Sequence, residues 1–526
     1  MWRSILKMPT LALWLIYFLG ASEHSIRGDD VTPIYQSYLD DSGAGREPML
    51  PDFSYAGYQR GEKPIPLVKG PIFDVTHYGA VPNSSKPAFE GIQNAINACE
   101  EAGGGVVWFP KGLYQVNPKP SEATQPRLRI QKSGVVLRGE GSGKDGSILF
   151  MEAEIQPEDP MKMWSGRPAL LVAPLKNQNS TQVGEVNGAV AMNQKLIPVK
   201  LGHKMKPDDR IAIINKVSAD LCDALNERIA PHTWEPQWTW GLRIHEKHEI
   251  ESVGKDYIIL KEGLLTPIKA NQVWTLNTIG YINNIGIENL CFRGNWHEVF
   301  VHHKDWRHDS GWRGIKMTNT ENSWIRNCVF EAMNWPIQIT ISRNSTMENI
   351  TFTGVEGHFG IQCSDATNIL NLNIRDEAGH WHGHSLQSGS CGIVYHGGIW
   401  KVNGSLDSHA RNPYANLFEC NKGGLTLQGC GGAREDFPHH LHACVIWNHV
   451  QTAKFNSPVD FWPEHKIRYH ASFANPILVG VTGIALDYRN SSVMESVGKQ
   501  VAPRSLWLAQ LKQRLGAVPM HFKKYE

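Results

Sequence analysis

The middle of the chain repeats one pattern of apolar and polar positions at an interval of 22 residues. Met317, Ile339 and Ile361 keep this interval, and each repeat mixes β-branched or apolar residues with an Asn, as strands do. A fixed repeat of this length predicts a right-handed parallel β-helix, in which each coil buries its apolar face against its neighbours. Three segments align without gaps, at 324–330, 346–352 and 368–374, with Asn327, Asn349 and Asn371 in matching places.

An amphipathic helix is expected near residues 86–102, where Phe89, Ile92, Ile96 and Cys99 recur at helical spacing. A strand precedes it, and residues 103–105, all Gly, end it before the next strand. Such a helix can cover the open end of a solenoid and hide the first coil. Residues 71–155 are therefore predicted to form an N-terminal cap and the first coils.

The remaining boundaries follow from where the repeat fades. Residues 23–70, rich in Asp, Gly, Pro and Tyr, are expected to form an extended arm. Residues 156–276 are expected to form a β-rich insertion or irregular coils, since 208–215 and 257–262 are strand-like and 234–240 is a Trp cluster. Residues 277–450 are the main β-helix with the active-site face, and 451–526 a C-terminal segment with a helix at 505–515. The fold class is all-β.

The first 22 residues have the pattern of a signal peptide. Arg3 and Lys7 precede an uncharged, mostly apolar stretch that ends in Gly20, Ala21 and Ser22, too short for a comfortable membrane span. A secreted or periplasmic protein with no membrane association after cleavage is expected.

The composition indicates which kinds of ligand the protein can bind. The net charge of +1 gives no support to nucleic-acid binding, which normally leaves a basic footprint. The 18 Trp residues fit stacking against sugar rings as well as ordinary core packing. The nine Cys are odd in number and include no CxxC pair, so buried thiols are expected rather than disulfides or a zinc cluster. The sequence does not indicate an oligomeric state.

Residues 73–116 (FDVTHYGAVP…GGGVVWFPKGLYQV) resemble the N-terminal signature of the pectate lyase superfamily, shared by polygalacturonase-like and other right-handed β-helix proteins. Residues 379–450 and the helix at 505–515 are similar to bacterial β-helix proteins that carry a further domain of unassigned function. The resemblance implies a carbohydrate-active enzyme on a β-helix.

Titratable residues cluster in two stretches, 379–398 and 406–450, and suit β-elimination on a uronic-acid polymer. That reaction needs a cation to neutralise the C5 carboxylate, a base to remove the C5 proton and an acid for the leaving oxygen. Arg313 or Arg434 can neutralise, and Asp407, two residues before His409, shares its strand face and can orient it. The predicted catalytic residues are His382, His384, Tyr395, Asp407, His409 and Tyr414, with His384 or His409 as base and Tyr395 or Tyr414 as acid.

A charged loop at 301–313 and the downstream stretches are expected to bind the polymer, because Arg and Lys pair with carboxylate or sulfate groups. The predicted binding residues are His303, Lys304, Arg307, Arg313, Arg411, Arg434, His439 and Trp381.

Two other functions stay open. Hydrolysis on this fold needs two carboxylates, for which Asp365 with Asp376 or Glu377 are candidates. Alternatively, a flank of Trp residues, Trp335 and Trp381 among them, binds a polysaccharide without cutting it. A product that absorbs near 235 nm distinguishes the lyase.

No metal site is assigned. His245, Glu246 and His248 form an HExH sequence without the longer spacing of zinc enzymes, and a polar strand edge is the favoured interpretation. Calcium remains a candidate cofactor, because several β-helix lyases use it to bridge a uronate, although no calcium loop is present.

Overall fold

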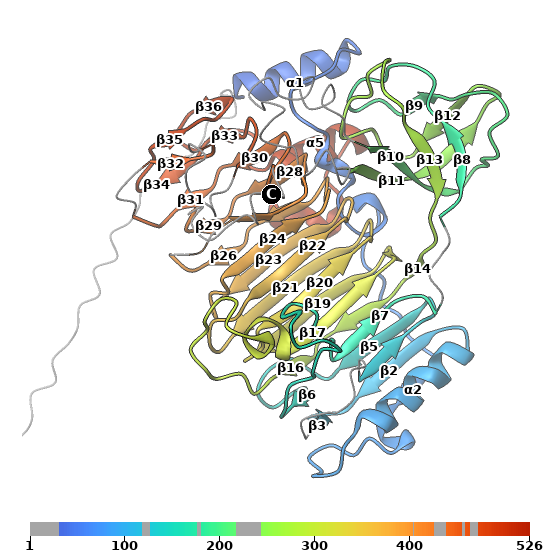
Figure 1. Cartoon of the computed structure of the whole chain (residues 1–526), viewed down its shortest axis with the longest axis vertical. Helices are drawn as coiled ribbons and strands as arrows, with labels where there is room; N and C mark the ends of the chain where they lie inside the picture. The colour runs from blue at the N-terminus through green and yellow to red at the C-terminus, as the bar shows by residue number, and fades with distance from the viewer. Residues whose placement is uncertain are drawn as a thin grey trace, which may run out of the picture.

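The protein is a parallel β-helix built from two long parallel sheets (Figure 1). The structure, a computed structural model, describes residues 31–117, 127–175, 180–216, 243–402, 404, 406–425, 438–454, 458–462 and 472–526. The predicted signal peptide at 1–22 and Trp cluster at 234–240 lie outside these residues. The all-β fold predicted from the sequence is confirmed.

One sheet has seven strands and carries the outer face described below. Its order is β27 (Leu406–His409), β24 (His382–Gln387), β22 (Phe359–Ser364), β20 (Trp335–Thr340), β17 (Arg313–Thr318), β7 (Leu170–Val172) and β4 (Leu128–Ile130).

The other sheet has 19 strands, whose pairings are parallel and run from the first coil to the last. They are β1 (Ile72–Asp74), β2 (Gly105–Phe109), β3 (Gly112–Asn117), β5 (Val135–Gly139), β6 (Ser147–Met151), β15 (Gly286–Glu288), β16 (Cys291–Arg293), β19 (Trp324–Glu331), β21 (Thr346–Thr353), β23 (Leu370–Asp376), β25 (Val394–His396), β26 (Ile399–Trp400), β28 (Asn416–Glu419), β29 (Lys422–Gly423), β30 (Cys444–Trp447), β31 (Val450–Gln451), β33 (Ile477–Val479), β34 (Thr482–Gly483) and β36 (Val493–Glu495). Two short pairs, β14 (Ile282–Asn283) with β18 (Thr320–Glu321) and β32 (Val459–Asp460) with β35 (Tyr488–Arg489), complete the solenoid.

The coils are not of one length, which corrects the predicted register. Trp324 pairs with Thr346, 22 residues on, but Thr346 pairs with Leu370, 24 residues on. The loop at 354–358 between β21 and β22 has two more residues than the loop at 332–334 between β19 and β20. The third segment therefore aligns at 370–376 rather than 368–374.

The Asn ladder shifts accordingly. Asn327 donates to Asn289 at 3.2 Å, Asn349 to Asn327 at 3.1 Å, and Asn373, not Asn371, donates to Asn349 at 2.8 Å. Likewise Met317 pairs with Ile339, and Ile339 with Cys363 rather than Ile361. Because 22 and 24 are both even, the division into inward and outward positions is unchanged.

The N-terminal cap forms as expected. Helix α2 (Phe89–Glu101) buries Ile92, Ala95, Ile96 and Cys99 in the main solenoid core, where they cover its first coil. The expectation of an extended arm at 23–70 is wrong for its described part, which contains helix α1 (Pro33–Gly43). Thr32 caps α1 by accepting from the Tyr35 N–H, and Pro33 fits the first turn.

The two ends of the chain pack together. Residues of α1 share one apolar cluster with helix α5 (Leu506–Leu515), which matches the predicted C-terminal helix. Gln510 of α5 also donates to the carbonyl of Pro51 and accepts from the Phe53 N–H, both at 2.9 Å. The solenoid meanwhile continues past residue 450 to β36, because the apolar strand β33 stacks on β30.

The expected β-rich insertion is a six-stranded antiparallel sheet that enters the chain between β7 and β14 (Figure 1). Its strands are β8 (Gln182–Glu185), β9 (Leu196–Pro198), β10 (Arg210–Lys216), β11 (Arg243–Val253), β12 (Tyr257–Leu260) and β13 (Thr275–Thr278). The HExH sequence lies on β11, where it pairs with β10 on one side, and β11 pairs with β12 only from Ile250 onward. Glu246 and His248 are buried.

The seven described Cys residues are free thiols, six of them buried, as predicted. Among the described residues, the helices are all too short or too polar to cross a membrane.

Candidate functional site

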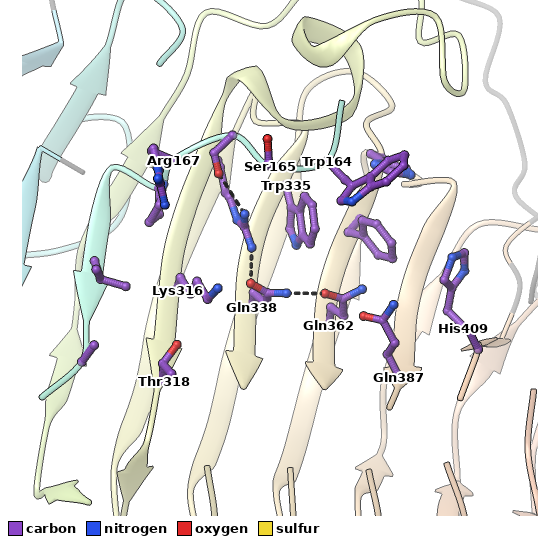
Figure 2. A pocket seen from close by; sticks show the side chains of 18 of the residues that line it. Trp164, Ser165, Arg167, Lys316, Thr318, Trp335, Gln338, Gln362, Gln387 and His409 are labelled. Carbon is purple, nitrogen blue, oxygen red and sulfur yellow. Dashed lines mark hydrogen bonds between the residues drawn. The ribbon is translucent and has the colours of Figure 1, made fainter. Parts of the chain in front are cut away.

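A groove of about 730 Å³ runs over the outer face of the seven-stranded sheet (Figure 2). The segment 164–168 and the start of the loop after β27 form its sides. Its lining is aromatic, cationic and amide-rich: Trp164, Ser165, Gly166, Arg167, Pro168, Leu171, Ala173, His303, Arg313, Lys316, Thr318, Trp335, Gln338, His358, Phe359, Gln362, Gln387, His409, Ala410 and Arg411.

Strand register sets the floor of the groove. Lys316, Gln338 and Gln362 occupy paired positions on β17, β20 and β22, and Thr318 lies two residues after Lys316 on the same face. Gln338 donates to Gln362 at 2.7 Å, as Figure 2 shows. Arg313 donates to Gln338 and, at 2.9 Å, to the carbonyl of Gly166. These bonds hold the guanidinium 4.0 Å above the Trp335 ring.

The groove concentrates positive charge. Burial, together with the nearby Arg167, lowers the pKa of Arg313 to about 9. Burial with Arg313 and Arg167 lowers the pKa of Lys316 to about 8. Among the described lining residues there is no Asp or Glu. Arg167 pairs with Glu158 outside the lining, whereas Arg313 and Lys316 have no carboxylate among the described lining residues, so the site is suited to an anion.

Asp407 lies beneath one end of the groove and holds two imidazoles. Its Oδ1 is 3.3 Å from Nδ1 of His382 and 3.5 Å from Nδ1 of His409, while Ser385 donates to Oδ2 at 2.6 Å. Although burial alone raises it, the two imidazoles hold the pKa of Asp407 below its usual range. The predicted pairing of Asp407 with His409 is present, and His409 lines the groove.

Further imidazoles crowd the adjoining wall. His302 stacks on Trp381 with ring centroids 5.2 Å apart and on His303 at 3.7 Å. Its Nε2 lies 3.3 Å from Nε2 of His382. Burial and the neighbouring imidazoles lower the pKa of His302 to about 3 and that of His358 well below its usual value. These rings are neutral at physiological pH.

Three predicted catalytic residues point away from the groove. His384 faces the solenoid interior, packed against Tyr395 and Trp400, and burial lowers its pKa to about 4. Tyr395 stacks on Phe418 in the main core. Tyr414 packs between the solenoid and the insertion and donates to the carbonyl of His245 at 3.3 Å.

The predicted binding residues divide in the same way. His303, Arg313 and Arg411 line the groove, and Trp381 lies beside it on His302. Lys304 lies near His308 and Glu298. Arg307 pairs with Glu154 at 3.1 Å in a separate cavity of about 300 Å³. His439 is buried and accepts from the Ser472 N–H at 3.0 Å. Arg434 lies outside the described residues.

Several groove residues escaped the sequence analysis. Trp164 and Arg167 come from a segment without a repeat, which gave no signal. Gln338 and Gln362, 24 residues apart, and His358 could have been found had the longer coil been recognised. His358 is the last residue of the longer loop at 354–358 and lines the groove.

Residues 379–525 match the model of a domain of unknown function, DUF4955. This segment starts where the sequence resembled bacterial β-helix proteins with a domain of unassigned function, and it covers the last coils and α5. A segment of 75 residues is 35% identical to the mannuronan C5-epimerase AlgE1 of Azotobacter vinelandii. The match spans 14% of this chain and 5% of the epimerase.

Solved structures with a similar fold share little sequence. The tailspike protein gp49 of Pseudomonas phage LKA1 aligns with a TM-score of 0.46 and 11% identity, covering 78% of this chain and 63% of the tailspike chain. The A-module of the A. vinelandii mannuronan C5-epimerase AlgE4 aligns with a TM-score of 0.36 and 12% identity, covering 81% of this chain and 96% of the module. DFA-IIIase of Arthrobacter chlorophenolicus A6 aligns with a TM-score of 0.37 and 12% identity, covering 85% of this chain and 89% of the DFA-IIIase chain. At these TM-scores the likeness says nothing about activity.

Proposed function

We propose that the protein is a carbohydrate-active enzyme, a polysaccharide lyase that cleaves a uronic-acid-containing polymer by β-elimination. One observation carries the proposal: the groove offers several cations and a carboxylate-supported imidazole, with no Asp or Glu among its described lining residues. This composition fits a reaction that neutralises a substrate carboxylate and removes the adjacent proton.

The residues divide into three roles. Arg313, held by Gly166 and Gln338, neutralises the C5 carboxylate, which makes the C5 proton more acidic, while Arg167 at the same groove is paired with Glu158. His409 takes that proton as the C4–O bond breaks, and a double bond forms between C4 and C5. Asp407, against Nδ1 of His409, orients the ring and stabilises the imidazolium that results.

The leaving oxygen requires a proton. Tyr395 and Tyr414 lie away from the groove, so neither is assigned this role. Lys316 lines the groove, and its pKa of about 8 makes its ammonium group a better acid than that of an ordinary lysine. We assign it as the proton donor.

Sugar binding has its own residues. Trp164, about half exposed, offers an aromatic face for stacking on a pyranose ring, while Gln338, Gln362 and Gln387 present amides toward hydroxyls (Figure 2). The short match to a mannuronan C5-epimerase adds support, since epimerisation at C5 and β-elimination both begin with loss of the C5 proton. Secretion to the periplasm or beyond, where such polymers occur, is part of the proposal.

Hydrolysis has weaker support. Asp365 pairs with Lys247 at 2.6 Å under the insertion, and Asp376 holds His380 at 3.0 Å, so these candidates do not line the groove. The separate cavity of about 300 Å³ does contain Glu152, Glu154 and Glu298, but Glu154 is paired with Arg307, and Glu298 lies 3.3 Å from Nε2 of His308. An inverting hydrolase needs two free carboxylates facing one bond.

A substrate panel tests the proposal. The purified protein is incubated with alginate, pectins, ulvan, glucuronan and glycosaminoglycans while absorbance at about 235 nm and reducing ends are followed together. Both signals rise together for a lyase. Reducing ends alone would establish a hydrolase, and binding with neither signal would establish a non-catalytic polysaccharide-binding protein.

A further inference from the structure

Three imidazoles at the groove wall form a nearly equilateral triangle. The ring centroids of His302, His358 and His382 are separated by 5.3 Å, 5.3 Å and 5.2 Å. The residues come from distant parts of the chain: the loop after β16, the loop between β21 and β22, and the start of β24. A fourth imidazole, His303, lies close by, and the ligand-capable nitrogens of His302, His303 and His358 are all within 4.8 Å of one another.

Groups on the far side of the rings set their orientation. Nδ1 of His358 donates to the carbonyl of Asp309 at 3.1 Å, and Nδ1 of His303 lies 2.6 Å from the buried carboxylate of the same residue. Nδ1 of His382 faces Asp407. Histidines that bind metals typically direct their second nitrogen to a carboxylate or a carbonyl in this way, which leaves Nε2 as the ligand.

Two of the Nε2 atoms face each other, and the third has no partner in the described part of the chain. Nε2 of His302 lies 3.3 Å from Nε2 of His382. His358 is only 2% exposed, and its buried Nε2 has no hydrogen-bond partner among the described residues. A buried nitrogen lone pair without a partner is costly unless a ligand satisfies it.

We propose that His302, His358 and His382 bind one divalent transition-metal ion of the zinc class through their Nε2 atoms. Tetrahedral zinc with Zn–N bonds of about 2.0–2.1 Å places such nitrogens about 3.3 Å apart and the ring centroids about 5 Å apart. The three centroid separations and the distance between Nε2 of His302 and Nε2 of His382 agree with these values. The donors are imidazole nitrogens, which suit zinc, copper or nickel, whereas calcium takes six to eight oxygens.

The site opens onto the groove, because His303 and His358 both line it. Three protein ligands leave a fourth position, as in zinc sites that bind an exchangeable group. His303, a water molecule or a carboxylate oxygen of a bound polymer can occupy that position. A bound ion would thus add an anchor for an anionic polymer, at the wall near His409 and Trp381.

Metal titration of the full chain tests the inference without any polysaccharide. Chelator-treated protein is titrated with Co²⁺, whose visible absorption reports tetrahedral coordination, and then with Zn²⁺ as competitor. We expect one ion per chain and displacement of Co²⁺ by Zn²⁺. No binding of either ion below about 100 μM, or a spectrum of octahedral Co²⁺ alone, would overturn the proposal.

Variants locate the ion. His302→Ala removes a half-buried ligand and is expected to weaken binding at least tenfold, as is His358→Gln. His77→Ala, at an exposed position in the N-terminal cap, is the matched control and keeps wild-type affinity. Circular dichroism confirms that each variant is folded. Equal affinity in wild type, His302→Ala and His358→Gln would contradict the site.

Discussion

Oδ1 of Asp407 lies 3.5 Å from Nδ1 of His409, two residues further along β27, and both side chains leave the same face of the strand. This contact connects a fully buried carboxylate to an imidazole at the groove surface. If His409 is the base, His409→Ala lowers kcat about 10²- to 10⁴-fold, with a smaller change in KM. The formation of unsaturated product at 235 nm measures the effect.

His384 contrasts with His409. It lies on β24, next to β27 in the same sheet, but its side chain faces the solenoid interior instead of the groove. His384→Leu keeps an apolar volume in the core and is expected to retain activity, since both ring nitrogens lack hydrogen-bond partners among the described residues. Loss of turnover in His384→Leu with unchanged far-ultraviolet circular dichroism would contradict the assignment, as would full activity in His409→Ala.

Lys316 gives the groove a pH dependence. It faces Arg313 and Arg167, and its pKa of about 8 means that it loses its charge as pH rises past that value. Affinity for an unsaturated or otherwise uncleaved uronate oligosaccharide should therefore fall between about pH 7 and 9. Calorimetry across this range measures the fall. Lys316→Met should bind weakly at every pH, and Lys316→Arg should flatten the dependence.

Rising pH should weaken ligand binding through Lys316 but increase the stability of the folded protein. Between pH 8 and the ordinary value of 10.5, the unfolded chain binds the proton that folded Lys316 has released. The free energy of unfolding should therefore increase with pH in this window, relative to Lys316→Met. Thermal midpoints of the two proteins at several pH values test the sign, and parallel curves would show that the lysine does not titrate as assigned.

The sequence predicted the site only where the chemistry follows strand alternation. Asp407 and His409 are two residues apart on one strand, so their common face could be inferred without the structure. His384 and Tyr395 were chosen for their residue type alone, although their side chains lie on the inward face of the strands. His384, for example, pairs with Ile361 and Leu406 in an inward row. Knowing the strand register would have removed these two candidates.

The imidazole cluster could not be predicted, because His302, His358 and His382 come from three loops or strand starts. Their convergence depends on the path of the loops after β16 and between β21 and β22, which periodicity does not describe. The fold itself was predictable since stacked coils must keep a nearly constant length. An error of two residues left every inward position inward.

A buried charge network joins the insertion to the solenoid. Arg343 is fully buried and donates to Glu262 of the insertion and, at 3.1 Å, to Glu321 of β18. Arg343→Met would remove the fully buried cation that Glu262 and Glu321 share, leaving Arg60 near Glu262 and Arg210 beside Glu321, which is expected to cost about 3–5 kcal/mol. Thermal unfolding monitors the loss. Arg46→Met, which removes an exposed ion pair with Asp41, should leave the midpoint unchanged.

The Asn ladder has a backbone requirement as well as hydrogen bonds. Asn289, Asn327, Asn349 and Asn373 all have φ near +53°, in the left-handed region that Gly and Asn adopt at lower cost than Ala. Asn349→Gly loses the side-chain bonds alone, whereas Asn349→Ala also takes on backbone strain of about 1–2 kcal/mol.

Asn349→Ala should therefore unfold at lower temperature than Asn349→Gly, although Ala is usually the better tolerated of the two residues. Thr351, two residues further along β21 and absent from the residues with positive φ, is the matched control. There the order should reverse, with Thr351→Gly less stable than Thr351→Ala. Differential scanning calorimetry of the four variants compares both orders. The same order at both positions would show that hydrogen bonding, not backbone conformation, selects Asn in the ladder.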